Sequence, residues 1–387
     1  MIHLLTWLPL QYQQTLCRAL QEHYGSDFIV WFAESEHLEF PYKSNTGSDL
    51  QRRYLNKDGY GQLFRALRSD SAAVVILGGW RSPMTVRVLF ITALLRVPVF
   101  IWADHPHPRN RGPIIKLVRQ IYLSLVSKLA VGFLACGEPT RRHLISSGIK
   151  EERTVVFPYW TELPANWLLP AGCPNGETGI KPLRLIAIGR VVSVKQFDIA
   201  IRAVAIANDR AGHPIAHLTI AGDGPERNSL EQLVRTTGCQ DQVTFLGWLE
   251  ADDALREIRA ADALVVTSNF EGYSAVVLEA MAAGRPVLAS DGVIAAIDRN
   301  EDTGAVLFHK VGDAETLATQ IAAFAHDRSR LREASIAARA TAEKWPLSRA
   351  IEILNSQIER TDAGKRIIRR TSDVERRPSF NSTGVNV

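Results

Sequence analysis

The second half of the chain alternates short apolar runs with longer amphipathic segments, and this alternation constrains the fold more than any other feature. The apolar runs lie at 183–189, 217–222, 242–247, 261–268 and 285–290. Helix-like segments at 197–208, 226–237, 251–260 and 274–283 separate them. Strands that are apolar throughout are typical of a parallel sheet with helices on both faces. The pattern therefore predicts a doubly wound α/β domain.

The first half repeats this pattern less regularly. Its apolar runs lie at 2–7, 27–32, 72–79, 97–102, 132–137 and 153–159, with helices expected at 13–23, 88–95 and 111–130. The segment 161–182 is rich in Pro and Gly and has no periodicity, which is typical of a linker. We therefore predict two α/β domains, at 1–165 and 183–344, joined by a linker at 166–182.

The sequence also predicts the state of the chain's end and the place of a ligand cleft. Residues 361–387 are polar and basic, and we expect a disordered tail there. In open α/β sheets, ligands bind beyond the carboxyl ends of the strands. Function should therefore lie in the loops that face a cleft between the two domains.

Composition excludes several other classes of protein. The chain has 387 residues, of which 46% are hydrophobic and 22% charged, as in ordinary globular proteins. Its four cysteines are far apart and form no CxxC pair, so they indicate neither a zinc site nor a disulfide framework. No run reaches the ~20 apolar residues of a membrane span, and the N-terminus does not resemble a signal peptide. We expect a cytoplasmic protein that is soluble or peripheral to a membrane.

The formal net charge of +4 is divided unevenly along the chain. Residues 1–160 carry a balance of +7, residues 161–360 a balance of −6, and residues 361–387 a balance of +3. Such an asymmetry indicates that the basic half meets an anionic surface or ligand. Drift among solvated side chains would produce the same difference, so charge alone leaves both explanations open.

The segment SNFEGYSAVVLEAMAAGRPVLAS, at 268–290, carries two glutamates with seven residues between them. We expect a helix from about Gly272 onward, and a helix N-terminus favours a phosphate group. Glu271 would then lie close to a bound sugar, and Glu279 could accept hydrogen bonds from vicinal hydroxyls. Alternatively, Glu271 only stabilises the helix dipole and Glu279 is merely exposed.

Two further segments contain candidate ligand contacts. In GRVVSVKQFDIAIRA, Gly189 and Arg190 end a strand and Lys195 follows five residues later, so the two cations could clamp a diphosphate. They could equally be ordinary surface cations. In LTIAGDGPERNSL, Gly222 and Gly224 form a turn after a strand, which by itself favours a tight connection without a ligand.

Together these segments, with VTFLGW, the later TGAVLF and weaker matches at 135–149 and 155–160, resemble the retaining glycosyltransferases of family 4, within the glycosyl transferases of group 1. The resemblance runs through about 185–310. It implies the GT-B fold, in which two Rossmann-like domains face a central cleft. It also implies a C-terminal helix at 345–360 that crosses back to the N-terminal domain.

The resemblance also assigns roles. A UDP- or GDP-linked sugar donor would bind the C-terminal domain, with Arg190 and Lys195 on its diphosphate. Glu271 would meet the donor sugar and Glu279 the ribose hydroxyls. The remaining donor contacts would come from Gly189, from Gly222 and Gly224 near the nucleoside, from Gly247 near the base, and from Gly272, Tyr273 and Ser274. No metal or other cofactor is expected, because the cations and the helix dipole neutralise the leaving group.

The acceptor would be read by the N-terminal domain. The segment ADHPHP at 103–108 holds Asp104 and His105, and either could contact the sugar or act as a base. His105 and His107 also have the spacing of a metal pair, although histidines beside prolines more often form a loop. The sequence departs from the family pattern in lacking a glycine-rich loop after its first strand and a second glycine at 291–304.

The segment 108–130 mixes five cations, at Arg109, Arg111, Lys116, Arg119 and Lys128, with large apolar residues. An amphipathic basic helix can lie on an anionic membrane surface, and a helix packed in the core with solvated cations is the alternative. The resemblance implies transfer to a glycan or lipid-linked saccharide at the inner face of the plasma membrane.

Two other functions stay open. A nucleotide-sugar epimerase can share the GT-B fold, and a catalytically silent binding protein could keep the donor pocket. No nucleic-acid recognition motif is present, so we expect no nucleic-acid partner.

Overall fold

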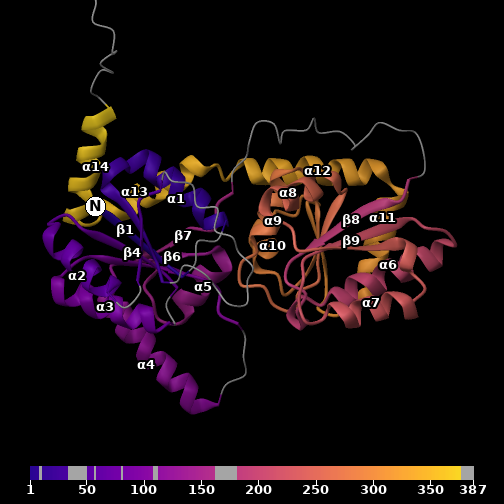
Figure 1. Ribbon diagram of the computed structural model, residues 1–387, viewed down its shortest axis with the longest axis horizontal. Coiled ribbons are helices and arrows are strands. Elements are labelled where there is room, and N and C mark those ends of the chain that lie inside the picture. Colours follow the sequence, from indigo (N-terminus) through magenta and orange to yellow (C-terminus); the bar gives the residue numbers. More distant parts are fainter. Residues whose placement is uncertain are drawn as a thin grey trace, which may run out of the picture.

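The structure is a computed structural model that describes residues 1–7, 11–33, 50–55, 58–79, 82–107, 112–161 and 181–375. It consists of two lobes, each built on one twisted sheet with helices on both faces (Figure 1). All strand pairs are parallel, in the orders β3-β2-β1-β4-β5-β6-β7 and β10-β9-β8-β11-β12-β13. The predicted pair of Rossmann-like domains is confirmed. The expected linker at 166–182 lies almost wholly outside the described residues.

The N-terminal sheet is built from seven short strands. They are β1 (Ile2–Thr6), β2 (Phe28–Phe32), β3 (Arg52–Tyr54), β4 (Val74–Gly78), β5 (Val99–Ala103), β6 (Gly132–Ala135) and β7 (Thr154–Val156). Its helices are α1 (Gln11–Tyr24), α2 (Gly59–Ser69), α3 (Pro83–Leu95), α4 (Pro113–Leu129) and α5 (Glu138–Ser146). All of the predicted strands are present, whereas the edge strand β3 and helices α2 and α5 were not predicted. Strand β3 is polar and only partly buried, so it lacks the apolar run by which the other strands are recognised.

The C-terminal sheet has six strands. They are β8 (Leu183–Ile188), β9 (Ala216–Ala221), β10 (Val243–Gly247), β11 (Ala263–Val266), β12 (Val287–Ser290) and β13 (Val306–His309). Its helices are α6 (Phe197–Ala211), α7 (Arg227–Thr236), α8 (Ala251–Ala260), α9 (Ala275–Ala282), α10 (Ile294–Arg299), α11 (Ala314–His326) and α12 (Arg328–Glu343). The central strands β11 and β12 are buried at every position, as their unbroken apolar sequence requires.

After α12 the chain returns to the N-terminal domain. Helix α13 (Leu347–Ile358) packs against α1, and the Tyr24 hydroxyl donates a 2.5 Å hydrogen bond to Asn355. At this crossing, the ring of Trp345 packs 5.9 Å from that of Trp160, which precedes the linker. One continuous buried cluster therefore extends from the N-terminal sheet through Trp160 into the C-terminal domain.

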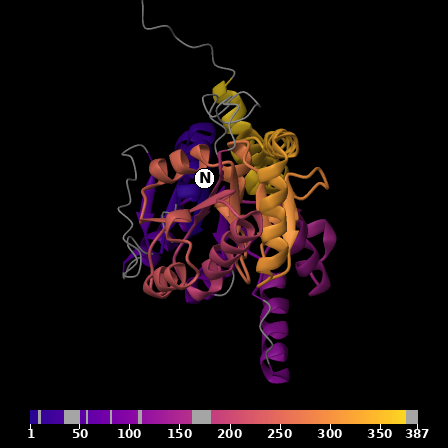
Figure 2. The same ribbon diagram turned by 90° about the vertical axis from the view of Figure 1, so that its right-hand side faces the viewer.

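Helix α4 departs from the core. It projects beyond the N-terminal domain in both views (Figures 1 and 2). Its C-terminal half is anchored by the buried Leu123 and Val126, whereas no described side chain of residues 113–122 is buried. The alternative of a core-packed helix is therefore wrong for the described side chains of residues 113–122.

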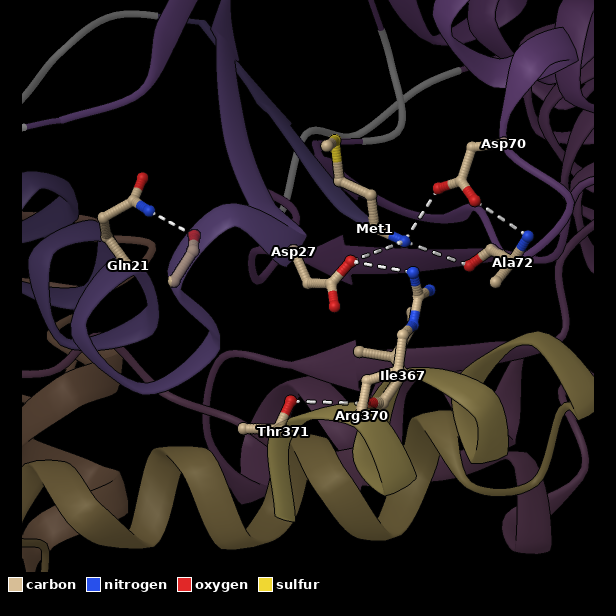
Figure 3. Close-up of polar contacts among 9 residues, drawn as sticks. Met1, Gln21, Asp27, Asp70, Ala72, Ile367, Arg370 and Thr371 are labelled. Atoms are coloured by element: carbon tan, nitrogen blue, oxygen red, sulfur yellow. Dashed lines mark hydrogen bonds and ion pairs between the residues drawn. The ribbon is translucent and has the colours of Figure 1, made fainter. Parts of the chain in front are cut away.

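The expectation of a disordered tail from residue 361 is wrong over α14 (Asp362–Glu375). Ile367 of this helix is fully buried, and Arg370 forms an ion pair with Asp27 at 3.4 Å (Figure 3). Asp27 also lies near the Met1 amino group, which forms a 2.7 Å ion pair with Asp70. The segment is mostly polar, so its fully buried apolar residue can be recognised only from the packing of the helix. Residues 376–387 lie outside the described residues.

We expect Ile367→Ala to lower the free energy of unfolding by about 2–5 kcal/mol, because it leaves a cavity under α14. Ile368→Ala is the matched control, since this neighbouring side chain is only half-buried and should cost less. Urea denaturation of both variants measures the difference. Equal and small losses would contradict the docking of α14.

Candidate active site

Two loops at the carboxyl edge of the C-terminal sheet bring the predicted cation and carboxylate together. Lys195, in the loop after β8, forms a hydrogen-bonded ion pair with Glu271, in the loop after β11. Both side chains are largely buried, at 17% and 19% exposed. The Ser268 hydroxyl donates a further hydrogen bond of 3.3 Å to the same Glu271 oxygen. The pair fixes a cation and an anion side by side before any ligand binds.

The backbone of these two loops is also tied together. The Thr267 hydroxyl donates to the carbonyl oxygens of Lys195 and Gln196 at 2.9 and 2.8 Å. The Asn269 N–H donates to the Val194 carbonyl at 2.9 Å. These contacts hold Lys195 and Glu271 in a preorganised arrangement, which strengthens their action on a developing charge.

The predicted glycines lie around the same edge. Gly189 adjoins the Lys195 side chain, and the exposed Arg190 follows it directly. Gly222 has a φ of +137°, and a Cβ there would overlap the Gly189 carbonyl oxygen. The Gly222 N–H donates to the Gly247 carbonyl at 2.7 Å. Only glycine at position 222 permits this close approach of three loops.

Gly224 extends the same packing. A Cβ on this residue would overlap the Val191 carbonyl oxygen, so the turn after β9 lies directly against the loop that carries Arg190. The structure therefore brings the glycines at 189, 222, 224 and 247 together at one edge.

Helix α9 begins at Ala275, later than the expected start near Gly272, and Ser274 is its N-cap residue. The backbone at 271–274 is therefore a loop, pinned where the Glu271 N–H donates to the Gly292 carbonyl at 3.0 Å. Glu279 lies inside α9, where burial raises the pKa of its carboxyl from the usual 4.5 to about 7. The alternative that Glu279 is merely exposed is wrong.

The N-terminal domain faces these loops across a cavity of about 640 Å³. Asp104 and His105, which follow β5, line it together with Phe270 and Gly272 from the loop after β11. A Cβ placed on Gly272 would lie 3.4 Å from the His105 carbonyl oxygen, so the two domains are in contact here. Both acceptor-side candidates lie in one cleft, and the choice between them stays open.

Two aromatic residues that the sequence did not single out, Tyr159 and Phe270, also line the cleft. The Tyr159 hydroxyl donates a 2.7 Å hydrogen bond to Asp104, and the Tyr159 ring packs edge-on against Tyr273 at 5.4 Å. The His107 ring lies 4.5 Å from that of Phe270. Single aromatic residues in loops carry no periodic signal, so only the tertiary structure reveals this lining.

Two kinds of site are absent from the described residues. No group of three or more His, Cys, Asp and Glu side chains in this part of the chain is placed to hold a metal ion. No helix within the described ranges is long and apolar enough to cross a bilayer.

Solved structures share this architecture over nearly the whole chain. HepE from Anabaena, crystallised in complex with UDP, superposes with a TM-score of 0.72 at 17% identity and covers 93% of this chain and 100% of its own. The lipopolysaccharide outer core galactosyltransferase WaaB gives a TM-score of 0.67 at 14% identity, covering 92% and 98%. The two facing Rossmann-like domains are thus a GT-B fold, as the sequence predicts.

Residues 177–341, in the C-terminal domain, match the family described as glycosyl transferases group 1. The lipopolysaccharide core biosynthesis glycosyltransferase LpsD of Rhizobium meliloti is 33% identical over 143 residues, which are 37% of this chain and 38% of LpsD. The D-inositol 3-phosphate glycosyltransferase of Nocardia farcinica is 28% identical over 67% of this chain and 57% of its own. The chain spans less than two thirds of the length of these relatives.

The raised pKa of Glu279 predicts how stability depends on pH. The folded chain holds the proton of the Glu279 carboxyl more tightly than the unfolded chain does. The resulting contribution to the free energy of unfolding is complete below about pH 4.5 and is lost as pH rises to about 7. We expect wild type to lose up to about 3 kcal/mol relative to Glu279→Gln over this interval. Urea denaturation at about pH 5 and pH 8 measures the change.

The control for this experiment is Glu333→Gln, on the exposed side of α12. Its difference from wild type should not grow with pH in the same way. A constant difference between wild type and Glu279→Gln would contradict the burial of this carboxylate.

Proposed function

We propose that this protein is a retaining glycosyltransferase that moves a sugar from a nucleotide-sugar, UDP- or GDP-linked, to a hydroxyl of a glycan or lipid-linked acceptor. The observation that carries the proposal is the preorganised Lys195–Glu271 pair beside a cleft that is closed by Asp104 and His105. Similarity to glycosyltransferases of lipopolysaccharide synthesis supports a role in cell-surface polysaccharide or glycolipid assembly. The UDP complex of HepE supports the donor class.

Charge stabilisation is the central chemical requirement of this reaction. When the bond between the sugar carbon and the diphosphate breaks, negative charge grows on the phosphate oxygens and positive charge on the sugar. Lys195 and Arg190 are proposed to stabilise the phosphate, together with the N–H groups before α9. Glu271 stabilises the sugar, and Glu279 accepts hydrogen bonds from the ribose. With these cations in place, the mechanism needs no metal ion.

Retention requires the acceptor to attack from the face that the diphosphate leaves. The acceptor oxygen bonds to the sugar carbon, the bond from that carbon to the phosphate oxygen breaks, and the acceptor proton passes to the departing phosphate. Asp104 or His105 orients the acceptor hydroxyl from the opposite wall of the cleft. Contact between the domains at Gly272 and His105 limits access of water and hence hydrolysis of the donor.

We expect Lys195→Ala to reduce sugar transfer by about 10²–10³, the usual effect of removing one group that stabilises the developing charge. Arg202→Ala is the control, because Arg202 is a cation on the exposed side of α6 and should leave transfer unchanged. A thermal-shift screen with UDP-, GDP- and ADP-sugars selects the donor, and NMR of the product determines whether the anomeric configuration is retained.

The same assays separate the alternatives. Sugar isomerised on the nucleotide, with none reaching an acceptor, would indicate an epimerase. Binding without any reaction would indicate a silent binding protein. The absence of a thermal shift with every nucleotide-sugar would contradict the donor site itself.

We further propose that α3 and α4 dock the enzyme on an anionic membrane surface at the inner face of the plasma membrane. Seven large apolar residues of α4 are 37–76% exposed, namely Ile114, Ile115, Leu117, Val118, Ile121, Leu125 and Leu129. Helix α3 adds Val86, Phe90 and Leu94, spaced four residues apart on one face and 55–70% exposed. Together they form an apolar surface, which we call the α3–α4 surface, of the kind that marks an interaction site.

The charge around the α3–α4 surface favours lipid over a second protein. Residues 80–130 contain eight Lys and Arg and one acidic residue, Asp104. Apolar side chains next to a cluster of cations are the signature of helices that lie in an anionic bilayer interface. This placement brings the cleft of the N-terminal domain to the membrane, where lipid-linked acceptors reside.

We expect the paired substitution Ile121→Ser and Leu125→Ser to abolish co-sedimentation with vesicles of phosphatidylcholine and phosphatidylglycerol. Lys116→Ser and Arg119→Ser should weaken it by about fivefold per charge, and only on anionic vesicles. Ile336→Ser is the matched control, because Ile336 is 45% exposed on α12, away from the α3–α4 surface.

Light scattering gives the outcome that contradicts membrane docking. A dimer that Ile121→Ser and Leu125→Ser dissociate, with unchanged vesicle binding, would assign the α3–α4 surface to a second copy of the chain.

A further inference from the structure

A buried carboxylate joins the two domains at a point that neither the sequence motifs nor the proposed mechanism uses. Asp298, at the end of α10 in the C-terminal domain, has a side chain only 4% exposed. One of its oxygens accepts a 2.6 Å hydrogen bond from the Glu138 N–H in the N-terminal domain. The other accepts a 2.9 Å hydrogen bond from the Tyr273 hydroxyl. A single side chain thus links the N-terminal domain to the loop at 271–274.

The contact with the N-terminal domain is built for a carboxylate. Glu138 is the first residue of α5, and its own N-cap residue, Gly137, has no side chain to satisfy the free N–H groups. Asp298 supplies that cap from the other domain, where the helix dipole favours a negative charge. Gly137 has a φ of +88°, and a Cβ there would lie 2.8 Å from the Asp298 carboxyl carbon. The glycine therefore leaves room for this contact.

The contact with Tyr273 leads directly to the candidate active site. Tyr273 lies between Gly272, which lines the cleft, and Ser274, the N-cap residue of α9. Its buried hydroxyl also accepts a 3.1 Å hydrogen bond from Arg299. Burial holds the pKa of this phenol well above its usual value, so it keeps the proton that it donates to Asp298. Asp298 therefore connects α5 to the loop at 271–274.

Arg299 connects the same cluster to the crossing between the domains. Its guanidinium carbon lies 4.0 Å above the ring of Trp345, and that of Arg349 lies 4.2 Å from the same ring. Arg299 belongs to α10 and Arg349 to α13, so the indole interacts with one cation from each domain. The cluster thus includes both the crossing and the cleft.

From this juxtaposition we propose that Asp298 is a positioning residue. It caps α5 and holds Tyr273, so that the closed arrangement of the domains and the ordered conformation of the loop at 271–274 form together. The inference rests on the proposed transferase function for its kinetic consequences but not for its structural ones. When the two domains are apart, Asp298 does not make its hydrogen bonds to Glu138 and Tyr273 at the same time. Acceptor-side residues then lie too far from the donor for transfer.

The test uses the full-length enzyme and compares Asp298→Asn with Asp291→Asn. Asp291 is the matched control because it also accepts a backbone N–H, from Val311, and pairs with Lys310, but makes no contact with the N-terminal domain. We expect Asp298→Asn to reduce kcat by about tenfold to a hundredfold, as for the loss of a hydrogen bond to a charged group. The Kd for the free nucleoside diphosphate should change less than twofold, since that ligand binds one domain.

Small-angle X-ray scattering gives a readout that does not depend on activity. The radius of gyration of Asp298→Asn in the presence of nucleotide should exceed that of wild type and of Asp291→Asn. Gly137→Ala disrupts the same contact from the N-terminal domain and should produce the same expansion and the same fall in kcat. Tyr273→Phe removes only one of the two hydrogen bonds, so its effect and that of Asp298→Asn should not add in the double variant.

The outcomes separate this inference from the proposed function. An unchanged radius of gyration in both Asp298→Asn and Gly137→Ala would overturn the inference, as would a Kd that weakens in step with kcat. Expansion in both variants without any transferase activity in wild type would support the contact and contradict the function instead. If Asp298→Asn does not fold, Gly137→Ala and Tyr273→Phe still decide the question.

Discussion

The candidate site depends on one constraint, which is that a parallel sheet covered on both faces leaves only its edges free for polar chemistry. Strands β11 and β12 are buried at every position, so they cannot present a reactive side chain from their interior. The loops after β5, β8 and β11 therefore carry Asp104, Lys195 and Glu271. Because two such sheets face each other, both walls of the cleft consist of loops that follow the carboxyl ends of strands.

Bulk electrostatics cannot account for the binding of an anionic donor that we propose. Residues 161–360 carry a formal balance of −6, yet this half holds the nucleotide-sugar site in the proposed function. Affinity for a diphosphate must therefore come from a few placed groups, namely Lys195, Arg190 and the N–H groups before α9. The ion pair with Glu271 serves this purpose, since it holds the Lys195 side chain in one orientation in a site that is largely shielded from water.

The sequence was sufficient for the parts of the molecule that follow from local pattern. Buried parallel strands have an apolar signature, and Lys195 and Glu271 lie directly after such strands, so their meeting follows from topology. The burial of Ile367 could not be predicted, because one apolar side chain in a basic segment has no period. Asp298 and Arg299 were missed for a related reason. Nothing in the segment GVIAAIDR indicates that both charged side chains are buried. The partner of Asp298 lies on α5, and the partner of Arg299 is the ring of Trp345.

The same long-range contacts explain why the two domains are one mechanical unit. The rings of Trp160, which precedes the linker, and Trp345, where the chain returns to the N-terminal domain, pack together. The hydrogen bond from the Glu138 N–H to Asp298 is a further contact between the two domains, away from this aromatic pair. A carboxylate there can be released by a small rotation, because its hydrogen bonds are short and directional. We therefore infer that the geometry of the cleft depends on a contact that lies outside the donor-binding motifs.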